Sequence, residues 1–264
     1  AVWQKDYDTF YTNFMNLARK DIRKDEKGNT YLPVMIKNEG NYAAQRGQWA
    51  FCQSVYPGQI FDDNPEAHQW AEETVNMLTD HREEGLVVNT GWMKDGIWSY
   101  FTSFYSHALQ WLGKTDGIPQ LLYDFANHSS PTMVWREEQK PVGKGNDEVG
   151  DMPHNWASAE FIRMVVHMIE FDRGNELHLF EALPKQWVKA GAVTQLNGLR
   201  TPFGRINLQL TVNAKGNEAK LDLAFLDTGN LPEKVVIHKK NWTREGGEES
   251  VKPAQHIALT IPIQ

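Results

Sequence analysis

The sequence predicts a chain of two parts, helical over residues 1–173 and built of antiparallel β-structure over residues 174–264. Before Gly174, apolar residues recur at the spacing of one helix face. Beyond Gly174, segments such as RINLQLTV, EAKLDLAFL, KVVIHKK and HIALTIPI alternate polar and apolar residues between the turns NAKGN, DTGN and REGGEE. We therefore expect a multidomain α and β protein, in which a helical domain is followed by an antiparallel β-sandwich.

The first three helices are predicted from periodicity and from their end signals. Apolar residues from Trp3 onward mark one face of a helix that reaches Lys24. TYLPVMI follows as a short extended segment, and NYAAQRGQWAFCQSVY forms a second helix that ends at Pro57. Asn64 caps a third helix with Pro65 at its first position, and this helix runs to about His81.

Three further helices follow before the β-domain. Apolar residues from Trp98 to Leu112 predict a fourth helix, which Gly113 ends. A fifth covers residues 116–126, and a sixth runs from near His154 to Phe171. The six helices are expected to pair as three hairpins.

Composition and charge exclude several classes of protein. A formal net charge of -7 and the lack of any Lys/Arg run argue against nucleic-acid binding. No apolar run approaches the roughly 18 residues of a membrane span. The single Cys52 excludes an intrachain disulfide, and Ala1 does not open a signal peptide. The absence of an initiator Met suggests a processed or truncated chain. The compartment is therefore undetermined, with a secreted or periplasmic location slightly favoured.

Tryptophan is unusually abundant, and the chain has ten of these residues. Flat apolar rings are good platforms for the C–H faces of pyranose sugars, so the excess favours a carbohydrate ligand. Three stretches each place Gly, a charged group, an amide and Trp just before a helix starts: NEGNYAAQRGQW, NTGWMKDGIWSYF and the segment from WREEQ to GDMPHNW. Because helix N-termini present free N–H groups, three such loops on one rim would line a pocket.

Several motifs together resemble the six-hairpin glycoside hydrolase superfamily. They are QRGQWAF, YPGQIF, TGWMKDGIWSYF, FANHSSPTMVWREEQ and GDMPHNWASAEFIRMV, with ELHLFEALPKQW and LRTPFGRINLQL in the β part. The resemblance implies a toroid of inner and outer helices closed by a β-sandwich. A complete toroid has about twice the helices counted here, so the chain is similar to half of an (α/α)6-type toroid plus the sandwich. It implies a carbohydrate substrate, and an N-terminal segment or second chain that completes the toroid.

The candidate catalytic groups are carboxyls in the loops before the helices. Glycoside hydrolysis uses a pair of carboxyl groups, and hydrolases of this resemblance commonly invert configuration. Glu137 and Glu138 are the first candidates for one member; successive residues of an extended segment point apart, so one of them faces the pocket, and Glu138 is slightly preferred. Asp151 and Asp95 are further candidates, although each could equally cap a helix or close a turn.

The candidate substrate-binding groups surround these carboxyls. Arg136 could hold the second carboxylate in place, and His154 could bind a sugar hydroxyl. The side chains proposed to stack on or hydrogen-bond the sugar are Trp92, Trp98, Trp135, Trp156, Gln45 and Arg46. His154 and His128 lack metal-ligand spacing, so no metal and no cofactor are expected.

Two alternative functions stay open. A polysaccharide lyase would abstract a proton beside a uronate carboxylate, with Tyr42, Tyr100, Tyr105, His107 or His154 as the candidate base. A non-catalytic sugar-binding or structural remnant is the other, because a fold does not fix its chemistry. An incomplete toroid would also expose an apolar patch and associate with a partner or with itself.

Overall fold

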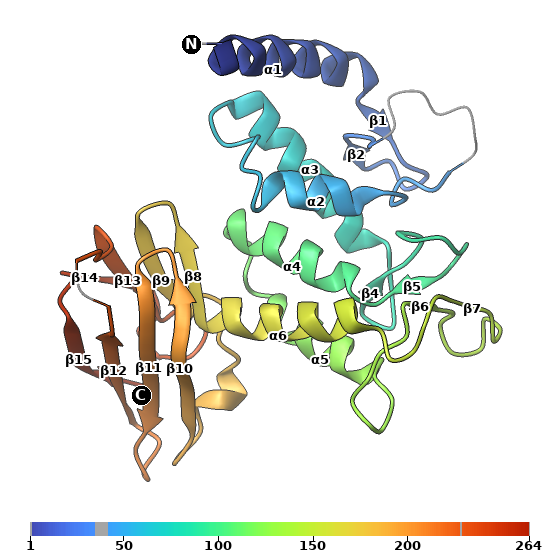
Figure 1. The fold of residues 1–264 in the computed structure, drawn as a ribbon. Helices are drawn as coiled ribbons and strands as arrows, with labels where there is room; N and C mark the ends of the chain where they lie inside the picture. Colours follow the sequence, from blue (N-terminus) through green and yellow to red (C-terminus); the bar gives the residue numbers. More distant parts are fainter. Residues whose placement is uncertain (1, 35–41, 228, 264) are drawn as a thin grey trace. The chain divides into compact units, whose positions relative to one another are not determined.

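A computed structural model describes residues 2–34, 42–227 and 229–263 (Figure 1). Within these residues it has six α-helices and several antiparallel sheets, so the mixed α and β composition is confirmed. The chain divides into two compact units, residues 1–164 and 165–264. The division falls within α6 rather than between residues 173 and 174, because Val165 and Ile169 belong to the apolar core of the β unit.

All six helices lie close to their expected places. Their bounds are α1 Val2–Asp21, α2 Gln48–Val55, α3 Pro65–Asp80, α4 Phe101–Trp111, α5 Ile118–Asn127 and α6 Asn155–Ile169. None of the described helices is both long and apolar enough to cross a membrane.

The helix ends show which local sequence signals were sufficient to predict a helix boundary. The side chain of Asn64 accepts hydrogen bonds from the backbone N–H groups of Glu66 and Ala67, as an N-cap does. The second helix is shorter than expected and begins at Gln48, because Gly47 adopts a left-handed φ of 76° that interrupts helical geometry. The first residue of that expected helix, Asn41, and the last two of TYLPVMI, Met35 and Ile36, lie outside the described residues.

Helix α4 is the centre of the first unit. Every residue from Phe101 to Gln110 is buried, so α4 is covered on all sides. Its aromatic side chains Phe101, Phe104 and Tyr105 supply apolar contacts. Half of these ten buried residues are nevertheless polar: Thr102, Ser103, Ser106, His107 and Gln110.

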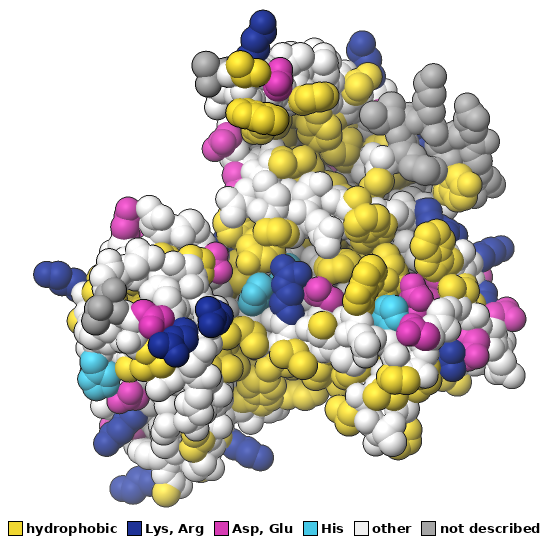
Figure 2. Space-filling model, in the orientation of Figure 1, with side chains coloured by type: hydrophobic (Ala, Val, Ile, Leu, Met, Phe, Trp, Pro, Cys, Tyr) yellow, Lys and Arg dark blue, Asp and Glu magenta, His cyan; other side chains and the backbone are white. Residues whose placement is uncertain are grey.

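Helix α1 is only partly buried. Met15 and Ala18 face inward, whereas Trp3 is 87% exposed, Tyr7 53% and Phe10 76%. These aromatic side chains lie on the face that the sequence predicted to be apolar. Figure 2 shows apolar side chains gathered over α1. The helix therefore presents an aromatic surface to solvent.

Short two-residue strands connect the helices of the first unit. They are β1 Arg23–Lys24 with β2 Thr30–Tyr31, β3 Arg82–Glu83 with β4 Leu86–Val87, and a three-stranded sheet of β5 Ile97–Trp98, β6 Glu138–Gln139 and β7 Glu148–Val149. The last sheet joins segments that lie some forty residues apart in the chain, since Trp98 pairs with Glu138 and Glu138 with Val149. This pairing positions the candidate site.

Two four-stranded sheets make up the β unit. One has the order β10 Val193–Thr201, β11 Gly204–Val212, β12 Glu218–Phe225, β15 His256–Pro262. The other has the order β14 Glu248–Val251, β13 Lys234–His238, β9 Glu176–Leu179, β8 Glu170–Arg173. The pair β9 and β13 is parallel, a departure from the all-antiparallel expectation. A short 3-10 helix, Lys185–Val188, follows β9.

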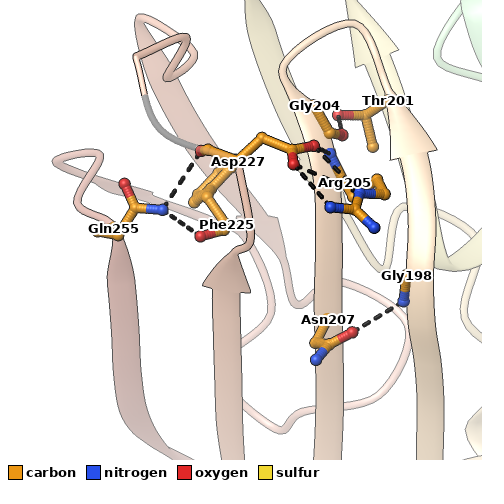
Figure 3. A network of polar contacts seen from close by, with 8 residues as sticks. All are labelled: Gly198, Thr201, Gly204, Arg205, Asn207, Phe225, Asp227 and Gln255. Atoms are coloured by element: carbon orange, nitrogen blue, oxygen red, sulfur yellow. Dashed lines mark hydrogen bonds and ion pairs between the residues drawn. The ribbon is translucent and has the colours of Figure 1, made fainter.

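The two sheets bury their alternating apolar residues in one core, which includes Leu177, Leu208, Leu221 and Ile237. Outside the core, polar contacts join β11 to β10 and to the end of β12 (Figure 3). Arg205 forms an ion pair with Asp227 at 3.0 Å. Asn207 Oδ1 accepts from the N–H of Gly198 at 2.8 Å, where the β10–β11 register shifts. The β-bulge is thus stabilised by a side chain of the neighbouring strand.

Candidate functional site

The β5–β6–β7 sheet brings three loops together in the first unit. β5 leads directly into α4, and β7 leads through residues 150–154 into α6. The loop of residues 89–96, the residues beside Glu138 and the segment before α6 therefore meet around one short sheet. Figure 2 shows a histidine bordered by acidic side chains and apolar rings where β5, β6 and the start of α6 meet.

Glu138 lies beneath this region with no exposed surface. Its carboxylate accepts a hydrogen bond from the backbone N–H of Trp92 at 2.7 Å and from that of Met93 at 3.1 Å. Burial raises the pKa of Glu138, while the two backbone N–H groups and the charge of Arg46 oppose the rise. As the structure stands, Glu138 fixes the loop of residues 91–96 and does not reach solvent.

Two glycines make room for this carboxylate. A Cβ atom at Gly91 would lie 2.7 Å from Glu138 Oε1, and one at Gly96 would lie 2.5 Å from the same atom. Both distances are far below van der Waals contact. The loop can enclose the carboxylate because both positions lack a side chain.

Glu137, Asp151 and His154 form a cluster next to the buried carboxylate. One ligand atom of each side chain lies within 4.8 Å of the other two. Asp151 Oδ1 is 2.5 Å from His154 Nδ1, and this hydrogen bond lowers the pKa of Asp151. The backbone N–H of Glu137 donates to the carbonyl oxygen of Asp151 at 3.2 Å, which ties the two segments together. Glu137 is partly exposed and Asp151 is exposed.

Aromatic rings surround His154. The ring of Tyr100 stacks on it with centroids 5.0 Å apart, and Trp156 meets the Tyr100 ring edge-on at 5.9 Å. Trp98 also contacts Tyr100, at 4.5 Å. Burial and the negative charge of Glu137 raise the pKa of Tyr100 well above its usual range, so the phenol stays protonated.

Several buried polar atoms in the same loops lack a hydrogen-bond partner among the described residues. They are His154 Nε2, Ser99 Oγ, Thr90 Oγ1, Gln45 Oε1 and Arg46 Nε. The loop of Gly47 lies against that of Thr90, since the Gly47 N–H donates to the Thr90 carbonyl at 3.3 Å. Buried polar groups in folded proteins are normally paired, so these atoms are suited to bind water or a ligand.

Two of the expected binding residues make structural contacts within the first unit. Trp135 is 3% exposed, donates its indole N–H to the carbonyl of Phe125 at 2.8 Å and packs on Phe161. Arg136 pairs with Glu148 at 2.9 Å across the β6–β7 hairpin instead of holding a second carboxylate of the cluster. Trp135 is thus a core residue, and Arg136 stabilises the hairpin.

The other tryptophans divide between surface and interior. Trp92 is 66% exposed and Trp156 is 68% exposed, so both are available for stacking. Trp98 is 8% exposed and lies behind Tyr100.

Asp95 belongs to the turn of the loop of residues 89–96. Its backbone N–H donates to Asn89 Oδ1 at 2.6 Å, with a left-handed φ of 55°. Among the described residues, no hydrogen bond or ion pair engages its carboxylate. Asp95 therefore shapes the turn of the loop.

Sequence reasoning missed the residues that support the site. The sequence suggested Tyr100 only as a possible lyase base, and neither Gly91 nor Gly96 was identified as the enclosure of a carboxylate. Gly91 and Gly96, on either side of Trp92, could have indicated this enclosure. Glycines often occur where the backbone closely approaches another group.

Groups of side chains that could hold a metal ion occur at three places in the described part of the chain. One is the Glu137, Asp151 and His154 cluster itself; the others are Asp25, Glu26 and His81, and His178, Glu181 and His238. At the first, two carboxylates and an imidazole form a set that can hold a cation or exchange protons with a ligand. No protein-family model matches the chain, and no curated protein matches it significantly.

Proposed function

We propose that the chain is part of a carbohydrate-active enzyme that hydrolyses a glycosidic bond at the cluster of Glu137, Asp151 and His154. The observation that carries the proposal is the placement of two carboxyls and a histidine within 4.8 Å of one another, with Trp156 exposed beside them. Carboxyl groups supply acid and base catalysis in glycoside hydrolysis, and an exposed indole ring binds a sugar face.

The two carboxyls have different roles in this proposal. The hydrogen bond from His154 lowers the pKa of Asp151, which favours an anion that activates water or stabilises positive charge. Glu137 contacts the substrate, and Glu138 positions the loop of Trp92. This assignment reverses the slight preference for Glu138 as the reacting group, because a catalytic carboxyl must touch its substrate.

The spacing of the cluster bears on the stereochemistry. Inverting enzymes hold their two carboxyls roughly 6.5–9.5 Å apart, and retaining enzymes about 5–5.5 Å apart. Atoms of Glu137 and Asp151 within 4.8 Å are too close for an inverting pair. For an inverting enzyme, we propose that this cluster supplies the base side and that the general acid comes from the segment or chain that completes the toroid.

Other features support the proposal of a toroid that a further segment or a second chain completes. The six helices and the two sheets around one core agree with half of a toroid followed by a β-sandwich. The exposed aromatic face of α1, with Trp3, Tyr7 and Phe10, is suited to pack against further helices. We propose that an N-terminal segment or a second chain covers it.

The decisive experiment is a screen of aryl glycosides and polysaccharides with the complete enzyme, measured by released phenol and by reducing ends. Glu137→Gln and Asp151→Asn are each expected to lower kcat by 100-fold or more without changing the melting temperature. Glu148→Gln is the matched control, since this exposed carboxyl lies on the neighbouring strand and pairs with Arg136. Full activity in both site variants would overturn the assignment of the reaction to this cluster. A wild type that hydrolyses none of these glycosides would favour the sugar-binding remnant.

The lyase alternative has less support. Its base would have to lose a proton near neutral pH, and the pKa of Tyr100 is raised instead. Burial also raises the pKa of Tyr105, to about 12, and this hydroxyl is hydrogen-bonded to Thr79. Ultraviolet absorption from an unsaturated product would nevertheless identify a lyase directly.

A further inference from the structure

A second group of ionisable side chains, His178, Glu181 and His238, belongs to the β unit. The two histidines are residues of β9 and β13, which are neighbouring strands (Figure 1). In this parallel pair His178 is in register with Val236. Paired residues share a face and alternate residues return to it, so His238 lies on the same face as His178. Glu181 follows β9 by two residues. His178 is 8% exposed, His238 9% and Glu181 7%.

The three side chains converge on one point. His178 Nδ1 lies 2.8 Å from His238 Nε2, and a carboxylate oxygen of Glu181 lies within 4.8 Å of a ring nitrogen of each. Two imidazoles and one carboxylate form a donor set typical of zinc. Tetrahedral zinc with bonds of about 2.0–2.1 Å separates two nitrogen ligands by roughly 3.3 Å, so the rings need to move apart by only about half an ångström.

The outer nitrogens of both histidines already contact carboxylates. His178 Nε2 is 3.1 Å from Glu176 Oε2, and His238 Nδ1 is 3.1 Å from Glu248 Oε1. Arg173 Nη2 donates to Glu181 Oε1 at 2.6 Å. Metal-binding histidines almost always have such an outer partner, which orients the ring and leaves the inner nitrogen to face the ion. All three side chains are thus oriented by a second group.

The other two clusters are less suited to a metal. The Asp25 carboxylate already accepts hydrogen bonds from the backbone of Lys27 and Asn29 and from His81. In the remaining cluster the Asp151 side chain is 72% exposed. The buried cluster of the β unit alone, among the described residues, combines two histidines with a carboxylate.

We propose that His178, His238 and Glu181 form a binding site for a divalent transition metal, with zinc as the best fit. Nitrogen donors exclude calcium and magnesium as preferred occupants. The ion would link strands whose histidines are 60 residues apart in the chain, with a fourth position for water. The competing explanation is that the histidine pair is joined only by a shared proton.

The test is titration of the metal-depleted chain with zinc chloride by calorimetry, followed by the visible absorption of the cobalt(II) form. We expect one equivalent to bind with micromolar or tighter affinity, to raise the melting temperature and to give the absorption of a four-coordinate site. His238→Gln should weaken binding at least 100-fold. His256→Gln is the control, because His256 is exposed and pairs with Asp222 on the other sheet.

A second variant separates metal loss from misfolding. Glu248 is exposed, so Glu248→Gln leaves the buried side chains in place and should weaken zinc binding by about 10–100-fold through His238 alone. Wild-type chain that binds no zinc would overturn the proposal. So would zinc binding that survives His238→Gln or that is lost in His154→Gln.

Discussion

The backbone N–H of Trp92 donates to the buried carboxylate of Glu138 over 2.7 Å, although the two residues are 46 positions apart. One end of this contact is fully buried, while the Trp92 side chain is 66% exposed. The interior of the first unit thereby fixes the loop that presents an aromatic ring to solvent.

Replacing this carboxylate should loosen the loop. In Glu138→Gln, the amide nitrogen would face a backbone N–H or lose a hydrogen bond, so we expect a loss of about 1–3 kcal/mol in unfolding free energy. The exchange rates of the Trp92 and Met93 amide protons should rise, as measured by hydrogen exchange. Glu137→Gln is the comparison and should leave both amides protected.

A methyl group at Gly96 should have a similar effect by steric means. A Cβ there would lie 2.5 Å from Glu138 Oε1 and 2.7 Å from Met93 Cβ, and Glu138 is too enclosed to move away. We expect Gly96→Ala to cost about 1–3 kcal/mol, the usual cost of overpacking. Gly117→Ala is the control, because nothing lies within 4 Å of its Cβ position. Equal melting temperatures for the two variants would contradict the packing argument.

Two tryptophans of the same region should differ sharply in what they contribute. Trp135 is buried between Phe125 and Phe161, so Trp135→Ala should lower the unfolding free energy by about 3–5 kcal/mol. Trp156 is exposed, so Trp156→Ala should change stability by only about 0.5 kcal/mol and should weaken sugar binding instead. Denaturation curves and a binding assay on the same two proteins make the comparison.

Glu170 should make the β unit less stable at high pH. Burial and the nearby charge of Asp172 raise its pKa from 4.5 to about 8. Between pH 4.5 and about 8, the folded state therefore holds a proton that the unfolded state releases. The free energy of unfolding falls across this interval by about 1.4 kcal/mol per pH unit.

Glu170→Gln removes this loss, since an amide stays neutral. The melting temperature of the variant should exceed that of the wild type at pH 8.5, and the two should approach each other at pH 5. Glu245→Gln, at an exposed position of the same unit, should show no such trend. A constant difference across this range would show that Glu170 does not titrate as described.

Local signals in the sequence were enough to predict the helices but not the side chains that their loops bury. Asn64 followed by Pro65 marked the start of α3, because an N-cap is a contact within four residues. The left-handed conformation of Gly47 was not predicted, so the predicted second helix was longer than α2 is. A glycine inside an apolar pattern does not reveal its own φ.

The sequence does not show which side chains of the candidate site point inward. The alternation of an extended segment shows that Glu137 and Glu138 point apart, but not which of them points inward. That choice depends on β6 pairing with β5, a contact between distant segments. The burial of Trp135 also depends on a distant contact, since it packs on Phe161 of α6. The cluster of His178 and His238 likewise requires the parallel pairing of β9 and β13, which alternation alone does not specify.

The enclosure of Glu138 also constrains how this protein can evolve. Gly91, Gly96 and Glu138 occupy one small volume, so a larger residue at either glycine is tolerated only when the acid is shortened or lost in the same lineage. Natural variants at the three positions should therefore change together, as a single inherited unit. The exposed Trp92 is free to vary independently of them, as the ligand of each descendant protein changes.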